Sequence, residues 1–185
     1  MRHMGWLIAT GMALAGSVAA ETWAGPDPAR QPAGSRDLDY AMAEICYPFL
    51  LQNATITQVS ENRGYKLILP DNPANRGQVL TLEVGGRDMN VLLDTRTADR
   101  DCDISIIGGD TAQLRNIATA RLAQWPVPLL PGRYGSAHGA VRDDEMCSAP
   151  GGPNDRVKIY SDDSPGHKAS FSLTLSRSDI RWPLC

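Results

Sequence analysis

The alternation of apolar and polar residues is clearest between Cys102 and Trp125, where a strand pattern is followed by a helix pattern. Three apolar residues alternate with polar neighbours, as is typical of a strand with one buried face: Cys102, Ile104 and Ile106. Asp110 is then a good N-cap and Pro126 a helix stop. Between them an apolar stripe recurs at helical spacing: Leu114, Ile117, Ala118, Leu122 and Trp125. The pattern predicts a helix over 110–124 that packs across a sheet.

Period-two alternation also predicts two hairpins and one short strand. The first hairpin turns at 85–88 and the second at 162–166, where glycine and aspartate gather. The strands are expected near 65–69, 80–84, 89–93, 156–160 and 171–175. Because successive strands are usually neighbours, the three strands before the long helix should form an antiparallel meander.

A helical pattern comes before the strands. It begins near Asp37 or Asp39 and places one apolar stripe on Leu38, Ala41, Met42, Ile45, Cys46 and Phe49. Pro48 should end or bend this helix, and Thr55 can cap a second, short helix that runs to Asn62. The sequence therefore predicts an α+β fold: an antiparallel sheet of five or six strands, one long helix packed on it, and an N-terminal helical segment.

Composition divides the chain into four parts. A basic start, a short apolar run and a small-residue cleavage site predict a signal peptide over 1–20, too short for a permanent membrane anchor. Residues 21–36 are rich in proline and lack apolar periodicity, which predicts a disordered leader. Residues 37–185 are expected to form a single domain, with a long irregular loop at 126–155. We therefore expect a periplasmic or extracellular protein.

Charge and cysteine content narrow the functional classes. The formal net charge of −3 argues against a nucleic-acid partner, because phosphate binding needs a basic surface. Four cysteines follow the signal peptide, and an even number in an exported chain favours two disulfides. Three pairings are open. We favour Cys46 with Cys102, which both face the predicted core, and Cys147 with Cys185, which would fix the C-terminal tail.

Leu92-Leu93-Asp94-Thr95 resembles the start of the aspartyl-protease motif, in which Asp-Thr-Gly places a catalytic carboxylate on a tight loop. A single copy resembles the retroviral-type enzymes, which dimerise so that two carboxylates share one proton. The chain departs from the motif at Arg96, which stands where the motif has glycine. The simpler interpretation is that Asp94 and Thr95 close a strand.

The other motifs in the sequence are weaker indications of catalysis or ligand binding. Ser136, His138 and the acidic run at 143–145 are the residue types of a hydrolytic triad, although no Gly-x-Ser-x-Gly elbow accompanies them. Gly108-Gly109-Asp110 lacks the further glycines or lysine of a nucleotide loop. His138 and His167 have no ligand at metal spacing. We therefore assign no catalytic residue, no cofactor and no metal from the sequence.

The succession Cys46-Tyr47-Pro48-Phe49, Asn62-Arg63-Gly64-Tyr65, a cysteine-led strand, Gly-Gly-Asp and a long helix resembles small exported bacterial proteins of unassigned activity, over residues 38–125. The resemblance implies an exported α+β domain and no catalytic residue. Our hypothesis is a non-enzymatic envelope or secreted protein that acts by binding, with an envelope protein as its partner. The alternative is a hydrolase that uses Asp94 or Ser136. The candidate binding loop holds Trp125, Leu129, Leu130 and Tyr134, which serve equally well to cover the sheet.

Overall fold

The computed structural model describes residues 34–60, 65–68, 79–84, 88–95, 99–132 and 135–178. The predicted signal peptide and most of the predicted leader lie outside these ranges. In chain order the elements are α1 (Ser35–Tyr40), the π-helix η1 (Ala41–Cys46), α2 (Tyr47–Leu51), α3 (Ile56–Ser60), β1 (Tyr65–Ile68), β2 (Val79–Val84), β3 (Met89–Asp94), β4 (Asp99–Ile107), α4 (Thr111–Leu122), β5 (Leu129–Pro131), β6 (Ser136–His138), β7 (Val141–Ser148), β8 (Asn154–Asp162) and β9 (Ser170–Ser178).

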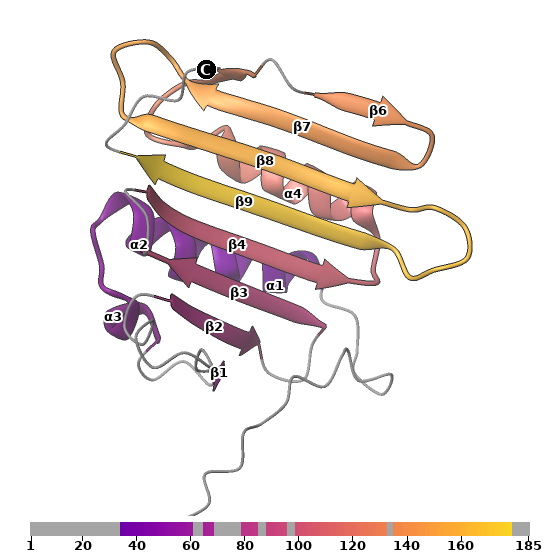
Figure 1. Ribbon diagram of the computed structural model, residues 1–185, viewed down its shortest axis with the longest axis horizontal. Coiled ribbons are helices and arrows are strands. Elements are labelled where there is room, and N and C mark those ends of the chain that lie inside the picture. Colours follow the sequence, from indigo (N-terminus) through magenta and orange to yellow (C-terminus); the bar gives the residue numbers. More distant parts are fainter. Residues whose placement is uncertain are drawn as a thin grey trace, which may run out of the picture.

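All nine described strands belong to one antiparallel sheet, in the order β1-β2-β3-β4-β9-β8-β7-β5, with β6 also paired to β7 (Figure 1). The predicted meander is confirmed, since β2, β3 and β4 pair in succession. The predicted second hairpin is also confirmed, as β8 pairs with β9 along its whole length. The sheet is α+β in class as expected, but it has more strands than the five or six that the sequence predicted.

The additional strands come from the region 126–155, where the prediction of a long irregular loop is wrong. This region contains β5, β6 and β7. Strand β7 pairs with β8, and Met146 of β7 lies opposite Val157 of β8. The pattern was hidden because β7 places a charged residue in a buried position. Glu145 is buried there, and its carboxylate pairs with the guanidinium of Arg156. Pro131 lies in the short edge strand β5, where a missing N–H costs no ladder bond.

The N-terminal helical segment runs from Ser35 to Leu51 without a break, so Pro48, which was expected to end or bend the helix, does not end it. The π-helix η1 explains why. The N–H of Tyr47 bonds to the carbonyl of Met42, five residues back, and Pro48 then lies in the first turn of α2, where its missing N–H is not needed. The segment also begins two residues inside the predicted leader, because Asp37 accepts a bond from the N–H of Gly34.

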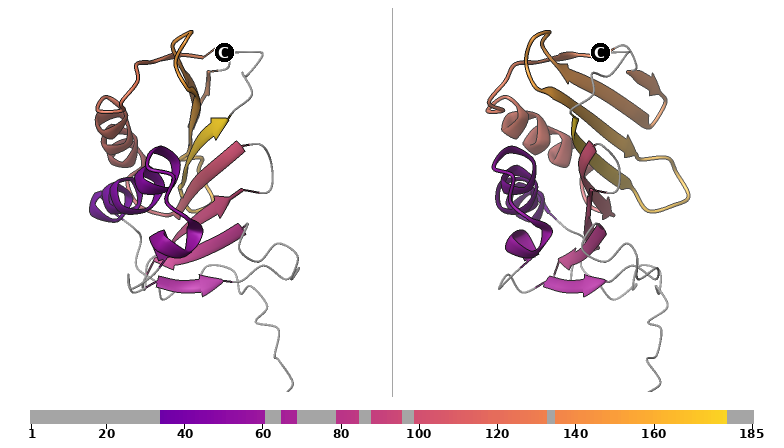
Figure 2. Two further views of the ribbon diagram at one scale, coloured as in Figure 1. Left: turned by 90° about the vertical axis from the view of Figure 1, so that its left-hand side faces the viewer. Right: turned by 60° about the vertical axis from the view of Figure 1, so that its left-hand side comes forward.

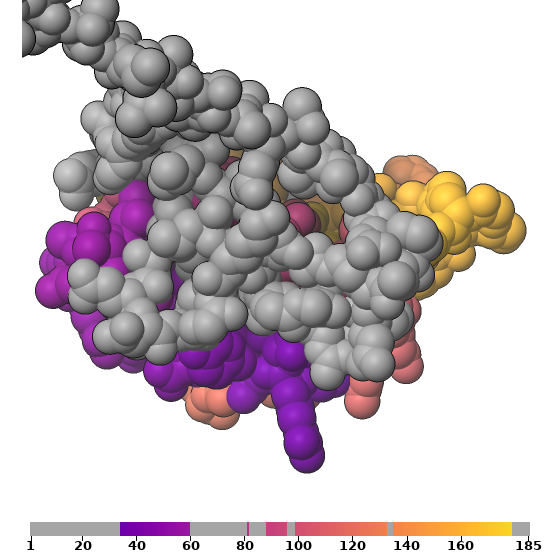
Figure 3. Space-filling view, turned by 90° about the horizontal axis from the view of Figure 1, so that it is seen from below, coloured from indigo at the N-terminus to yellow at the C-terminus, as the bar shows by residue number. Residues whose placement is uncertain are grey.

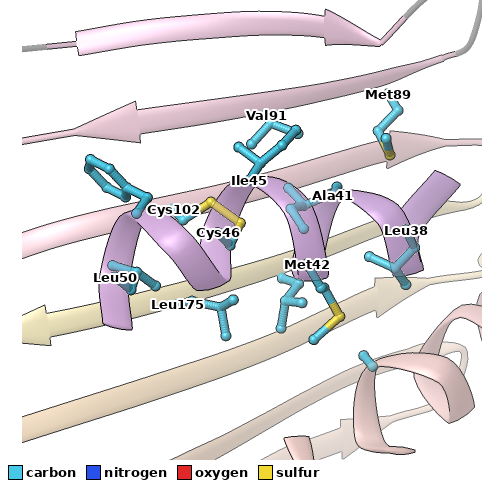
Figure 4. Packing of buried hydrophobic residues seen from close by; sticks show 14 of the residues in the cluster. Leu38, Ala41, Met42, Ile45, Cys46, Leu50, Met89, Val91, Cys102 and Leu175 are labelled. Atoms are coloured by element: carbon cyan, nitrogen blue, oxygen red, sulfur yellow. A yellow bond between two sulfur atoms is a disulfide. The ribbon is translucent and has the colours of Figure 1, made fainter. Parts of the chain in front are cut away.

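Every described helix lies on the same side of the sheet (Figure 2). The N-terminal segment packs near β4, and α4 packs near β8 and β9. Asp110 caps α4 by accepting from the N–H of Gln113 at 3.0 Å. The buried cluster between helices and sheet includes Leu38, Ile45, Leu50, Met89, Val91 and Leu175, which Figure 4 labels. Phe49, Ile104, Leu114, Val157 and Leu173 belong to the same cluster.

The predicted disulfide between Cys46 and Cys102 is present and joins the π-helix to the central strand β4 (Figure 4). Both cysteines are fully buried. Cys147 is disulfide-bonded as well. Its predicted partner, Cys185, lies outside the described residues, so that pairing stays a prediction. The disulfide between Cys46 and Cys102 therefore fixes the N-terminal helical segment to one face of the sheet. None of the described helices lies on the other face.

Candidate functional site

The sheet face opposite the helices, called here the outer face, carries most of the polar residues of the central strands. Alternation places Cys102, Ile104, Leu173, Val157 and their neighbours toward the helices, so the residues between them point the other way. On the three central strands these outer residues are Asp101, Asp103 and Ser105 in β4, Ser172, Thr174 and Ser176 in β9, and Arg156, Lys158 and Tyr160 in β8. Eight of these nine side chains are either charged or belong to serine or threonine, and the ninth is Tyr160.

Strand register arranges these nine residues in three rows that cross the sheet. Each row has a β9 residue at its centre and is flanked by its partners in β4 and β8. The rows are Asp101-Ser176-Arg156, Asp103-Thr174-Lys158 and Ser105-Ser172-Tyr160. Two rows thus run from a carboxylate through a hydroxyl to a cation. The outer face is acidic on the β4 side of β9, whereas on the β8 side Arg156 and Lys158 lie beside the acidic Asp143 and Glu145 of β7.

The acidic side is crowded with like charges. Asp94, the last residue of β3, is the register partner of Asp101. Burial raises the pKa of Asp101, a hydrogen bond from Ser176 opposes this rise, and the charges of Asp103, Asp99 and Asp94 add to it. Burial likewise raises the pKa of Asp103, with opposition from Thr174 and a further rise from the charge of Asp94. Ionised carboxylates in this position favour a cation brought to them.

On the β8 side of the outer face, the charged side chains differ in how far they are exposed to solvent. Lys158 is exposed, and its register partner in β7 is Glu145. The Glu145 side chain is only 2% exposed, and Arg156 donates to it. Gly132 lies so close to Glu145 that a Cβ at this position would come within 2.7 Å of its Cγ. Glu145 therefore lies on the outer face as a nearly buried partner of Arg156, and the ammonium group of Lys158 is the cation that this side exposes.

Asp94, from the stretch that resembles the aspartyl-protease motif, lies on this acidic side of the outer face. Asp94 closes β3 and Thr95 follows it, as the simpler interpretation expected, and Arg96 lies outside the described residues. The fold brings Asp94 next to Asp101 within one chain. A second carboxylate therefore lies nearby without dimerisation, which is the feature that acid–base catalysis by paired carboxylates needs.

The serine-type candidates also share one part of the fold. Strand pairing sets Ser136 opposite Asp143, and His138 lies two residues along β6 on the same face. Ser136 and His138 are exposed. Within the part of the chain that the structure describes, no hydrogen bond links Ser136 to His138 or His138 to Asp143. The residue types of a triad are therefore close together without the hydrogen-bond chain that activates a serine.

The candidate binding loop is divided between core and surface. The Trp125 indole donates to Asp155 at 2.9 Å, and its ring meets the edge of Tyr47 with centroids 6.1 Å apart. Trp125 and Leu129 both pack against the buried cluster. Leu130 is 47% exposed. Tyr134 lies outside the described residues, so a binding role for this loop stays a prediction, and Leu130 is the most exposed of its described members.

Two further properties bear on function. Within the described part of the chain, no group of three or more His, Cys, Asp or Glu residues is placed to hold a metal ion. None of the described helices is long and apolar enough to cross a membrane. Comparisons with protein-family models, with curated proteins and with solved structures gave no match.

The outer-face residues were not singled out from the sequence. Alternation around Cys102 and Ile104 already placed Asp101 and Asp103 on the face away from the core. The missing information was the strand order, because β4 becomes a neighbour of β9 only through a crossover, whereas β8 and β9 form the predicted hairpin. Local pattern therefore gave the direction of each side chain but not which charges share a row.

Proposed function

We propose that this protein is an exported, non-enzymatic domain that acts by binding, in the cell envelope or outside the cell, with an envelope protein as partner. The observation that supports this most is the polar, charged outer face, which the described helices leave uncovered (Figure 1). A broad face built from strand rows offers many shallow polar contacts, which suit a macromolecular partner better than a small molecule.

Export is supported by the disulfide between Cys46 and Cys102. Disulfides persist in oxidising compartments and are rare in the cytosol. The signal-peptide pattern at 1–20 agrees with this location. We further propose that the long helix α4 and the N-terminal helical segment have a structural role, in which they cover the apolar face and keep the sheet rigid.

A hydrolase is the second candidate, and one observation favours it. Asp94 and Asp101 are register partners on an acidic surface where burial raises the pKa of Asp101. A carboxyl group whose pKa is raised can serve as the acid of a catalytic pair, with a neighbouring carboxylate as the base. Ser136, opposite Asp143, is the weaker alternative.

Substrate profiling separates the two candidates. Purified mature protein is assayed with mixed peptide and ester substrates beside Asp94→Asn and Ser136→Ala, whose folding is checked by thermal unfolding. We expect no turnover above buffer for any of the three proteins. Turnover by the wild type that either variant abolishes would replace the binding proposal with the hydrolase.

A further inference from the structure

Side chains on the outer face of β9 become more buried toward the end of that strand. Ser172 and Thr174 are half-buried, whereas Ser176 and Ser178 are buried. All nine described strands belong to the sheet itself, and the described helices lie against its other face. None of these elements therefore covers the two buried serines from the outer side.

Strand β7, two strands away, shows the same trend along its outer face. Asp143 is half-buried, and Glu145 and Cys147 are buried. Gly132 accounts for the burial of Glu145, because it lies against that side chain. Cys147 is apolar and buried but does not belong to the core cluster, and its register partner in β8 is the outer-face residue Arg156. Cys147 is therefore shielded from the outer side, like the end of β9.

Cys147 is also bonded to another cysteine. The chain has four cysteines, and Cys46 and Cys102 are bonded to each other. Cys185, the last residue, is the cysteine that remains for Cys147 within the same chain. A bond between these two brings the end of the chain to the outer face, at the place where the buried side chains gather.

We propose that the C-terminal tail, residues 179–185, crosses the outer face from the end of β9 to Cys147, where Cys185 fixes it. This segment lies outside the described residues. Ser178 pairs with Asn154 of β8 and Cys147 pairs with Arg156 of β8, so the two ends of the tail are separated by two strand spacings, about 10 Å. Seven extended residues reach about 23 Å, which is enough to cross β8 over Arg156.

The composition of the tail suits a segment that covers a surface. Ile180, Trp182 and Leu184 are large and apolar, so contact with the sheet removes apolar area from water. Leu130, the register partner of Cys147 in β5, is exposed and provides an apolar neighbour for them. Apolar contact and one covalent bond together hold the tail on the face.

The tail divides the outer face into two parts. It covers the end that contains Ser176, Arg156 and Cys147. It leaves open the neighbouring row, in which Asp103 is half-buried and Lys158 is exposed. The chain's own C-terminus therefore occupies one end of the face, and release of the tail would enlarge the surface that a partner can reach.

Arginine labelling of the full mature chain tests this position of the tail. Phenylglyoxal modifies guanidinium groups, and peptide mass spectrometry follows each arginine separately. Arg156 is half-buried and should react several-fold faster in Cys147→Ser/Cys185→Ser than in the wild type, because the freed tail no longer covers it. Arg121, which is half-buried and ion-paired on the helical side, is the matched control and should react equally in both proteins.

A second variant keeps the disulfide and weakens the apolar contact, so that the test does not depend on the folding of the first. Ile180→Ser/Trp182→Ser should also speed the labelling of Arg156 relative to Arg121, and thermal unfolding confirms that each variant is folded. Labelling of Arg156 at the wild-type rate in the folded variants would overturn the proposal. Peptide mapping of the wild type that joins Cys147 to any cysteine other than Cys185 of the same chain would overturn it as well.

This inference concerns the same face as the proposed function, but it does not require a partner. The two fail in different ways. Turnover abolished by Asp94→Asn removes the binding proposal and leaves the labelling of Arg156 as it is. Labelling of Arg156 that does not respond to the tail removes the tail from the face and leaves the binding proposal in place.

Discussion

Asp155 and Arg177 are register partners in β8 and β9, and the carboxylate accepts two hydrogen bonds of 2.7 Å from the guanidinium group. Asp155 is 1% exposed and also accepts from the indole of Trp125. Arg177 in turn donates to the carbonyl of Leu50 at 3.3 Å. One ion pair on the helical side therefore ties together two strands, the end of α2 and the segment after α4.

Removing this carboxylate should destabilise the fold strongly. Asp155→Ala leaves Arg177 without its partner in a mostly buried position, for which we expect a loss of about 3–5 kcal/mol in the free energy of unfolding. Trp125→Phe, the matched control, keeps an aromatic ring and removes one hydrogen bond, at a loss of about 1–2 kcal/mol. Urea unfolding measures both changes. Equal losses in the two variants would contradict a central role for the ion pair.

The disulfide between Cys46 and Cys102 should be a main source of stability. It closes a loop with a sequence separation of 56 residues, for which chain entropy gives about 4 kcal/mol. The variant Cys46→Ala/Cys102→Ala should lose a free energy of unfolding of this size in urea unfolding. Since both cysteines are fully buried, the wild-type bond should resist mild reductant in the folded state. A variant as stable as the wild type would show that packing alone holds the helical layer.

Asp101 and Asp103 should make the free energy of unfolding depend on pH. The pKa values of Asp101 and Asp103 are raised above 3.8 in the folded protein, so the folded state binds more protons than the unfolded state in the range just above that value. Their contribution to the free energy of unfolding is therefore favourable at low pH and is lost as the pH rises through the raised pKa values.

The variant Asp101→Asn/Asp103→Asn isolates this contribution. It should be at least as stable as the wild type at neutral pH, and the difference should shrink as the pH falls toward 3.8. Thermal unfolding at about 500 mM salt makes the comparison with exposed ion pairs screened. A difference that does not change with pH would show that the two carboxylates are not perturbed.

The mature chain should begin at Glu21 and contain two disulfide bonds. The apolar run and the small residues that end at Ala20 predict cleavage there. Intact mass spectrometry of protein recovered from the exported fraction checks the N-terminus, and non-reducing peptide mapping checks the pairing of Cys147 with Cys185. An uncleaved N-terminus, or Cys147 joined to Cys46, would contradict the export account.

Local pattern predicted much of the sheet correctly. The strand at Cys102 and both hairpins were found because each has apolar residues on one face and a turn of small or polar residues. Strand β7 was missed because Glu145 occupies a buried position that only its ion pair with Arg156 makes tolerable. Whether Pro48 would end the helix or only bend it could not be decided from the sequence, because a π-helix depends on backbone geometry that residue spacing does not encode.

The candidate site was less predictable than the fold. The motifs visible in the sequence combine residues that are close together along the chain, such as Asp94-Thr95 or Ser136 with His138. The rows of the outer face instead combine residues more than fifty positions apart, such as Asp103 and Lys158. The turn between β8 and β9, which carries His167 and Lys168, projects beyond the body of the sheet and was correctly placed as a turn (Figure 1 and Figure 3).

Lysine acylation of the protein in its native compartment tests most directly whether the outer face is the binding surface. Lys158 lies on that face and Lys168 lies in the projecting turn beside Asp88, and both are exposed. We predict that Lys158 is several-fold less reactive in intact envelopes or undiluted secretions than in purified protein at about 500 mM salt, whereas Lys168 reacts equally in both. Equal reactivity of Lys158 in the two states would contradict the assignment of the outer face as the binding surface.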